Sequence, residues 1–201
     1  MSENKGFIRS LNLPNRLTLL RVVLVPVYLV LAKAGCTRSV AQGGALRWLA
    51  LLVFALASLT DLFDGKIARK YNLVTNFGKF LDPIADKLCV TCAMLYLLEL
   101  ELVPSWAVLV ILAREFIVSG LRMVVASEGT VIAASNLGKW KTAVTMLAIG
   151  GFLLSVTIPA GKLATMLELL SHALMTAAVV LTAWSGIDYL VKSWPAVAHS
   201  K

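Results

Sequence analysis

The sequence predicts an all-α polytopic membrane protein with six transmembrane helices and a short N-terminal interfacial helix. Of its 201 residues 59% are hydrophobic and the mean hydropathy is +0.82, which is more apolar than an ordinary soluble domain. Six apolar runs reach membrane-spanning length, although polar residues shorten some of them at one end. They cover residues 17–35, 46–63, 84–103, 104–126, 142–160 and 166–191. We expect one membrane domain over residues 1–201, made of an interfacial segment (1–14), a six-helix bundle (15–191) and a tail (192–201).

The positions of the basic residues predict how these helices are oriented. Fifteen of the 19 Lys and Arg residues lie on the side that holds both termini and the connection after the second run. Cytoplasmic segments of membrane proteins carry the excess of positive charge, so this side is expected to be cytoplasmic. The other four are Lys33, Arg38, Arg47 and Lys162. We expect a multi-pass protein of the cell's inner (cytoplasmic) membrane, whose net charge of +8 reflects topology and attraction to anionic lipid rather than nucleic-acid binding.

The first 14 residues predict an amphipathic segment at the membrane surface. Phe7 and Ile8 are mixed with Lys5 and Arg9, which is typical of a short interfacial helix. A signal peptide is the alternative, because basic residues precede an apolar run. Pro26 inside that run, and five further spans after it, favour a retained first helix.

Four aspartates surround the connection between the second and third runs. At helical spacing Asp61 and Asp64 share one face of the second helix, and Asp82 and Asp86 share one face of the third. Ionised carboxylates inside a bilayer are costly and repel one another, so they need cations. Mg²⁺ or Mn²⁺ suits an all-carboxylate site, and two metals roughly 3.5–4 Å apart recur in displacements at phosphorus. Taken singly, each aspartate could be a helix cap or a solvated interfacial charge, but four together predict a metal site.

The neighbours of these aspartates predict that the site handles phosphate. Gly65 and Gly78 remove side chains where a bulky ligand could approach the backbone closely. Arg69 adds a planar guanidinium that suits phosphate oxygens.

A second polar cluster lies in the fourth run and at the start of the fifth. Arg114 and Arg122 are about two helical turns apart, so both can face one cavity. Lys139 and Lys141 open the fifth run, and together the four cations predict a basic pocket beside the aspartates. Two alternatives stay open: Glu115 could simply pair with an arginine, and Lys139 could be a snorkelling anchor.

The pattern D-x2-D-G-x2-A-R-x8-G-x3-D-x3-D, from Asp61 to Asp86, resembles the signature of the CDP-alcohol phosphatidyltransferase family at every defined position. The resemblance extends from about Asn12 to Thr142. Members of this family move a substituted phosphate from a CDP-alcohol to a hydroxyl acceptor and release CMP. The resemblance therefore implies a metal-dependent enzyme that uses CDP-diacylglycerol in membrane lipid, with its active site facing the cytoplasm, and it implies a homodimer.

The resemblance also implies a role for individual residues. Two Mg²⁺ or Mn²⁺ ions would be held by Asp61, Asp64, Asp82 and Asp86. CDP-diacylglycerol would be bound by Asn15, Thr18, Asp61, Gly65, Ala68, Arg69 and Gly78. Asp82 and Asp86 would be the catalytic residues, with Asp86 as the general base.

The acceptor follows from the second cluster. Arg-Glu-x3-Ser-Gly-Leu-Arg from residue 114, with Gly-Lys-x-Lys-Thr from residue 138, resembles family members whose acceptor is glycerol 3-phosphate. An acceptor with its own phosphate needs cations, which Arg114, Arg122, Lys139 and Lys141 would supply. The alternative acceptor is phosphatidylglycerol, which would make the protein a cardiolipin synthase. Its phosphodiester and second pair of tails fit a small basic pocket less well.

An ion transporter is the alternative from another functional class. Such a protein can also place carboxylates inside a helical bundle. It would not require Gly65, Arg69 and Gly78 at fixed offsets, so the transferase interpretation accounts for more of the sequence.

Overall fold

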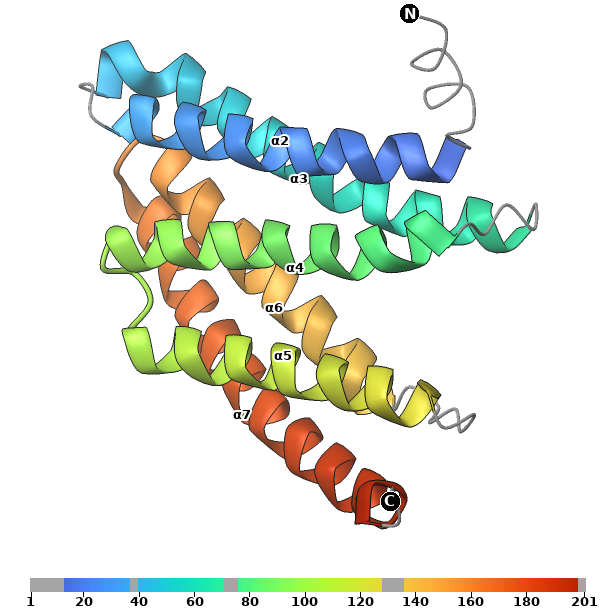
Figure 1. Cartoon of the computed structure of the whole chain (residues 1–201). Coiled ribbons are helices and arrows are strands. Elements are labelled where there is room, and N and C mark those ends of the chain that lie inside the picture. Colours follow the sequence, from blue (N-terminus) through green and yellow to red (C-terminus); the bar gives the residue numbers. More distant parts are fainter. Residues whose placement is uncertain (1–12, 37–39, 71–75, 128–135, 199–201) are drawn as a thin grey trace, which may run out of the picture. The chain divides into compact units, whose positions relative to one another are not determined.

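The computed structural model describes residues 13–36, 40–70, 76–127 and 136–198 (Figure 1). Six helices make up nearly all of these residues. They are α2 (Leu13–Cys36), α3 (Val40–Lys70), α4 (Asn76–Glu99), α5 (Ser105–Ser127), α6 (Asn136–Thr157) and α7 (Lys162–Ala198). The expected interfacial helix before residue 13 lies outside the described residues.

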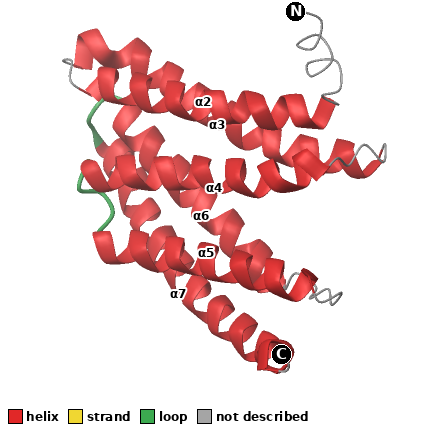
Figure 2. Ribbon diagram, viewed as in Figure 1, coloured by secondary structure: helices red, strands yellow, loops and turns green. Residues whose placement is uncertain are grey.

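The all-α prediction is confirmed, because no residue within these four ranges forms a strand (Figure 2). Each predicted run corresponds to one helix, and most helices extend a few residues beyond the apolar run. Within the described residues three helical segments are long and apolar enough to cross a membrane, and Gly44–Thr60 is a shorter apolar segment. The three are Arg16–Cys36, Leu137–Thr157 and Lys162–Ser193. The chain is therefore a helical membrane protein.

The turn between α4 and α5 shows how the local sequence ends a helix. Leu102 N–H donates to the Leu97 carbonyl and Glu101 N–H to the Leu98 carbonyl, both at 3.0 Å, which is the Schellman pattern. Glu101 adopts the left-handed conformation that this motif requires, with φ 58°. Pro104 directly precedes α5, and its carbonyl accepts a hydrogen bond from Ala107 N–H at 3.0 Å in the first turn of that helix.

The described helices form two compact units. One comprises Met1–Ala93 with Thr157–Pro159, and the other comprises Met94–Val156 with Ala160–Lys201. In the first unit α2 packs along α3, and the rings of Tyr28 and Phe54 lie 5.6 Å apart at 48°. Near the same end of both helices, Arg47 Nε donates to the Gly35 carbonyl at 3.1 Å. The prediction of a single membrane domain stays a prediction.

In the second unit α5 and α6 both contact α7. Ile149 and Phe152 of α6 are fully buried, and the Phe152 ring meets His172 of α7 edge to face at 4.8 Å. A Cβ atom added at Gly151 would collide with Ser171 Oγ, so the absence of a side chain at Gly151 allows α6 and α7 to approach closely here. This close packing holds the helices that carry the basic cluster.

Candidate active site

The aspartate signature lies on two consecutive helices of the first unit. The last three turns of α3 carry Asp61, Asp64, Gly65, Ala68 and Arg69, and the first half of α4 carries Gly78, Asp82 and Asp86. The helical backbone confirms the spacing argument, because each set repeats at three or four residues and so shares one face. The side chains of these eight residues lie outside the described residues, and their ligand roles stay predictions.

Chain geometry allows the two pairs of aspartates to lie at a similar depth. Lys70 and Asn76 are six residues apart, so the facing helix ends lie within about 22 Å of each other. Asp61 is about 14 Å back from the end of α3, and Asp86 is about 15 Å into α4, at 1.5 Å per residue. The two helices can therefore bring both carboxylate pairs to one level.

The chemistry of the donor set suits a hard divalent cation. Two carboxylates from each helix supply only oxygen ligands, which Mg²⁺ and Mn²⁺ prefer. Among the side chains that the structure describes, no group of three or more His, Cys, Asp or Glu could hold a metal. The predicted metal site thus continues to rest on the four aspartates.

The first helix contributes two buried polar residues to the same unit. Thr18 and Arg21 of α2 have side chains that are almost wholly buried, and both interact with other protein groups. An interfacial anchor would keep its charged end exposed, so burial favours an inward-facing role for Arg21. The side chain of Asn15 lies outside the described residues.

In the second unit an acidic residue joins two of the predicted acceptor cations. Glu115 Oε1 accepts a hydrogen bond from Lys141 Nζ of α6 and lies 3.3 Å from Arg114 Nη1. The Lys141 side chain is 5% exposed and that of Arg114 is 12% exposed. The alternative that Glu115 pairs with an arginine is therefore confirmed. Because the same carboxylate also binds Lys141, the pairing holds Arg114 and Lys141 close together within the cluster.

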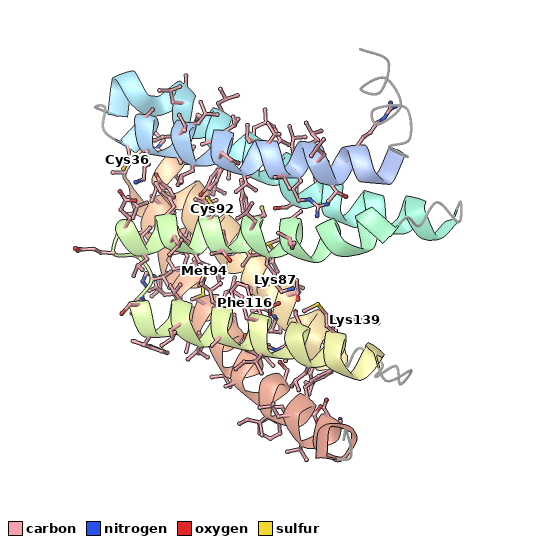
Figure 3. The ribbon with its side chains drawn as sticks, viewed as in Figure 1. Cys36, Lys87, Cys92, Met94, Phe116 and Lys139 are labelled. Carbon is pink, nitrogen blue, oxygen red and sulfur yellow. The ribbon has the colours of Figure 1, made fainter. Side chains whose placement is uncertain are left out.

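The other two cations are placed differently. The Arg122 guanidinium lies 5.6 Å from the centroid of the buried Tyr189 ring, which is a cation–π contact between α5 and α7. Lys139 is exposed at the start of α6 (Figure 3). Two helical positions separate it from Lys141, so the two lysines point to nearly opposite sides of α6. The exposure of Lys139 favours the snorkelling anchor, and its assignment to the acceptor stays a prediction.

Comparison with known proteins identifies the family. The family model of the CDP-alcohol phosphatidyltransferases matches residues 11–184. The chain belongs to this family. The matched residues include all four aspartates and all four predicted acceptor cations.

Several curated relatives are similar to this phosphatidyltransferase over nearly its whole length. The CDP-diacylglycerol–glycerol-3-phosphate 3-phosphatidyltransferase of Bacillus subtilis (strain 168) is 40% identical over 200 residues, covering 94% of this chain and 98% of the relative. The protein of the same name from Rickettsia typhi is 42% identical over 178 residues, covering 89% and 94%. A probable phosphatidylglycerophosphate synthase of Mycobacterium tuberculosis is 42% identical over 191 residues, covering 94% and 84%.

The structure adds residues of α7 that the sequence argument missed. Gly186 lies against Arg114, because a Cβ atom added there would be 3.1 Å from Arg114 Cγ. Tyr189 and Ser193 are buried on the same face of α7. Thr182, Gly186, Tyr189 and Ser193 recur every three or four residues, so a stripe of small and polar residues at the end of the last run and just beyond it was the available signal. Tyr189 and Ser193 lie beyond the region that the phosphatidyltransferase family model matches.

Proposed function

We propose that this chain transfers the phosphatidyl group from CDP-diacylglycerol to glycerol 3-phosphate, giving phosphatidylglycerophosphate and CMP, in the synthesis of anionic phospholipid. The observation that carries this proposal is the buried basic cluster of the second unit, in which Arg114 and Lys141 share one carboxylate. The names of the curated relatives support the same reaction.

The charge of the basic cluster favours glycerol 3-phosphate over phosphatidylglycerol. Arg114, Arg122 and Lys141 contribute three positive charges and Glu115 removes one, which leaves a charge of about +2. A phosphate monoester carries roughly −1.5 to −2 at pH 7, whereas a phosphodiester carries one negative charge. A monoester therefore matches the charge of the cluster more closely than a diester does, with Arg114 and Lys141 largely buried and Arg122 exposed beside Tyr189.

The aspartates of α3 and α4 would hold two Mg²⁺ or Mn²⁺ ions. When bound, these ions would neutralise the diphosphate of CDP-diacylglycerol and stabilise the charge that develops on the leaving CMP. Asp61, Asp64, Asp82 and Asp86 would hold them. The diphosphate would also contact Arg69, whose planar guanidinium suits phosphate oxygens, and Gly65 and Gly78 would let the nucleotide approach the backbone.

Asp86 would act as the general base. The primary hydroxyl of glycerol 3-phosphate attacks the β-phosphorus, its proton passes to the Asp86 carboxylate, and the bond between that phosphorus and the bridging oxygen of CMP breaks. Asp86 lies one turn beyond Asp82 on α4, so it can share the metal environment and remain ionised.

The membrane orientation supports this reaction. The distribution of Lys and Arg predicts that both termini and the aspartate signature face the cytoplasm. A water-soluble acceptor can reach the site from that side, while the diacylglycerol tails remain in the bilayer. The homodimer implied by the family resemblance is part of the same proposal.

An acceptor screen tests the reaction. Purified protein in detergent micelles is given CDP-diacylglycerol and Mg²⁺, and CMP release is measured with glycerol 3-phosphate, phosphatidylglycerol, serine or inositol phosphate. We expect release with glycerol 3-phosphate and loss of that release when EDTA removes the metal. Release that depends on phosphatidylglycerol instead would establish the cardiolipin reaction. Ion flux in liposomes, with no CMP release from CDP-diacylglycerol in the presence of any of these acceptors, would establish a transporter.

A further inference from the structure

Three buried donor groups in the described part of the second unit have no hydrogen-bond partner. They are Arg114 Nε, Tyr189 OH and Ser193 Oγ. Tyr189 is 4% exposed and Ser193 is 1% exposed, so bulk water does not serve them. A buried donor without a partner is unfavourable, and folded proteins rarely keep one without a reason. Three of them beside a basic cluster indicate a ligand that supplies the missing acceptors.

Two of the three donors belong to residues that meet between α5 and α7, and the third lies one turn farther along α7. The stem of Arg114 lies against Gly186, and the guanidinium of Arg122 lies over the Tyr189 ring. Ser193 follows Tyr189 by one helical turn on the same face of α7.

Hydroxyls earlier on the same face of α7 behave differently. Thr182 Oγ1 donates to the Ala178 carbonyl at 2.6 Å, and Ser185 Oγ donates to the Thr182 carbonyl at 3.2 Å. Each of these hydroxyls is satisfied by its own helix. The Tyr189 phenol is too long to reach a carbonyl of its own helix, and Ser193 does not use one. The earlier hydroxyls on this face of α7 are therefore bonded to their own helix, whereas Tyr189 and Ser193, farther along the face, remain available as donors.

We propose that Tyr189 and Ser193 bind the phosphate of the acceptor, together with Arg114 and Arg122. This inference rests on the proposed function and adds two residues from outside the matched family region. A phosphate monoester has three terminal oxygens, and Arg114 Nε, Tyr189 OH and Ser193 Oγ offer three donors to them. The hydroxyls add hydrogen bonds without adding charge, so the cluster stays matched to a dianion. By fixing the phosphate they would also orient the attacking hydroxyl at the other end of the acceptor.

The test compares three conservative variants of the full-length protein. Tyr189→Phe and Ser193→Ala each remove one available donor, and Ser185→Ala removes a buried hydroxyl of the same face that already has a partner. A hydrogen bond to a charged group corresponds to roughly a 10- to 150-fold change in affinity. We expect Tyr189→Phe and Ser193→Ala each to raise the KM for glycerol 3-phosphate by about tenfold or more, with the KM for CDP-diacylglycerol unchanged. Ser185→Ala should leave both values at the wild-type level.

A thermal readout separates this role from a structural one and does not depend on turnover. Without acceptor, Tyr189→Phe and Ser193→Ala should have a Tm equal to or above that of the wild type, because each removes an unsatisfied buried donor. Glycerol 3-phosphate or inorganic phosphate should raise the Tm of the wild type and of Ser185→Ala, and raise it much less in the two test variants.

Distinct outcomes would overturn the inference and the proposed function. An unchanged KM for glycerol 3-phosphate, or an equal rise for both substrates with a lowered Tm, would remove that residue from the acceptor site. If wild-type protein releases no CMP with glycerol 3-phosphate but gains Tm from phosphate through Tyr189 and Ser193, the binding site stands and the proposed reaction falls. If phosphate stabilises all variants equally, the site itself is wrong.

Discussion

At the scale of single residues, the surroundings of a charged side chain decide what it can do. Glu115 was ambiguous in the sequence, since it could either remove an arginine from the pocket or belong to it. In the structure it holds Lys141 of α6 beside Arg114 of α5. A single carboxylate thus sets the net charge of the cluster and fixes the position of two of its cations.

Glu115→Gln should destabilise the free protein by about 1–3 kcal/mol, because it leaves two largely buried cations uncompensated. The partial exposure of Glu115 keeps the loss below that of a fully buried ion pair. The measurement is Tm in detergent, with sulfate or glycerol 3-phosphate added in a second series. Either anion should restore more of the Tm in the variant than it adds to the wild type, since it replaces the lost charge.

Asp188→Asn is the matched control for this effect. Asp188 forms an ion pair with Lys192, one turn away on α7, but the Lys192 side chain is 64% exposed. Loss of an exposed pair of this kind costs less than about 0.5 kcal/mol. Equal Tm losses in both variants would show that Glu115 has no special role in the basic cluster.

Asp86→Asn should separate proton transfer from nucleotide binding. Loss of a general base lowers kcat by about 10²–10⁴-fold, whereas CDP-diacylglycerol should still bind. Asp61→Asn should impair both, because it removes a predicted metal ligand that is also predicted to contact the nucleotide. Titration of CMP onto each purified variant with Mg²⁺ present, beside turnover, provides the measurement. If both variants lose CMP binding to the same degree, Asp86 is mainly a metal ligand.

At the scale of helices, adjacent glycines of α6 have different functions. A Cβ atom at Gly151 would collide with Ser171 Oγ, whereas a Cβ atom at Gly150 has nothing within 4 Å. Ser171 Oγ also donates to the Leu167 carbonyl at 2.7 Å, so it cannot turn away without losing that bond. The sequence shows only a Gly-Gly pair, and the structure assigns the helix contact to its second member.

Gly151→Ala should therefore destabilise the second unit by roughly 1–3 kcal/mol through overpacking. Gly150→Ala is the matched control and should be neutral or stabilising by up to about 1 kcal/mol, because alanine favours a helix over glycine. The double variant Gly151→Ala, Ser171→Ala should recover most of the loss, since the Ser171 Cβ atom is an ordinary 3.5 Å from the added methyl group. Thermal melting in detergent measures all three, and an additive double variant would contradict direct contact.

At the scale of the whole molecule, the distribution of Lys and Arg predicts which side of the membrane each end of a helix faces. Cys36 is exposed at the end of α2 that should face away from the cytoplasm, and Cys89 is buried within α4. A membrane-impermeant maleimide added to intact spheroplasts should therefore label Cys36. A Cys36→Ser protein carrying Lys192→Cys should be labelled only after lysis. Labelling of Lys192→Cys in intact spheroplasts would reverse the predicted topology.

The helical membrane fold, the six helices and the residues that carry the proposed chemistry could all be predicted from the sequence. Hydropathy, helical spacing and the signature from Asp61 to Asp86 are properties of short stretches, so they can be recognised without knowing which helices meet. They located the helix ends to within eight residues, and Arg114 and Lys141 were correctly expected to lie together.

The assembly of the basic cluster could not be predicted from the sequence, because it depends on how α5, α6 and α7 pack. Lys139 and Lys141 look equivalent in the sequence, yet one is exposed and the other is buried against Glu115. Tyr189 and Ser193 are more than sixty residues from Arg114 and Arg122 in the sequence, and no local sequence pattern predicts that these residues lie in the same region. Burial and hydrogen bonding depend on which faces of α5, α6 and α7 pack together, and that choice follows from side-chain fit between distant segments rather than from the period of any one helix.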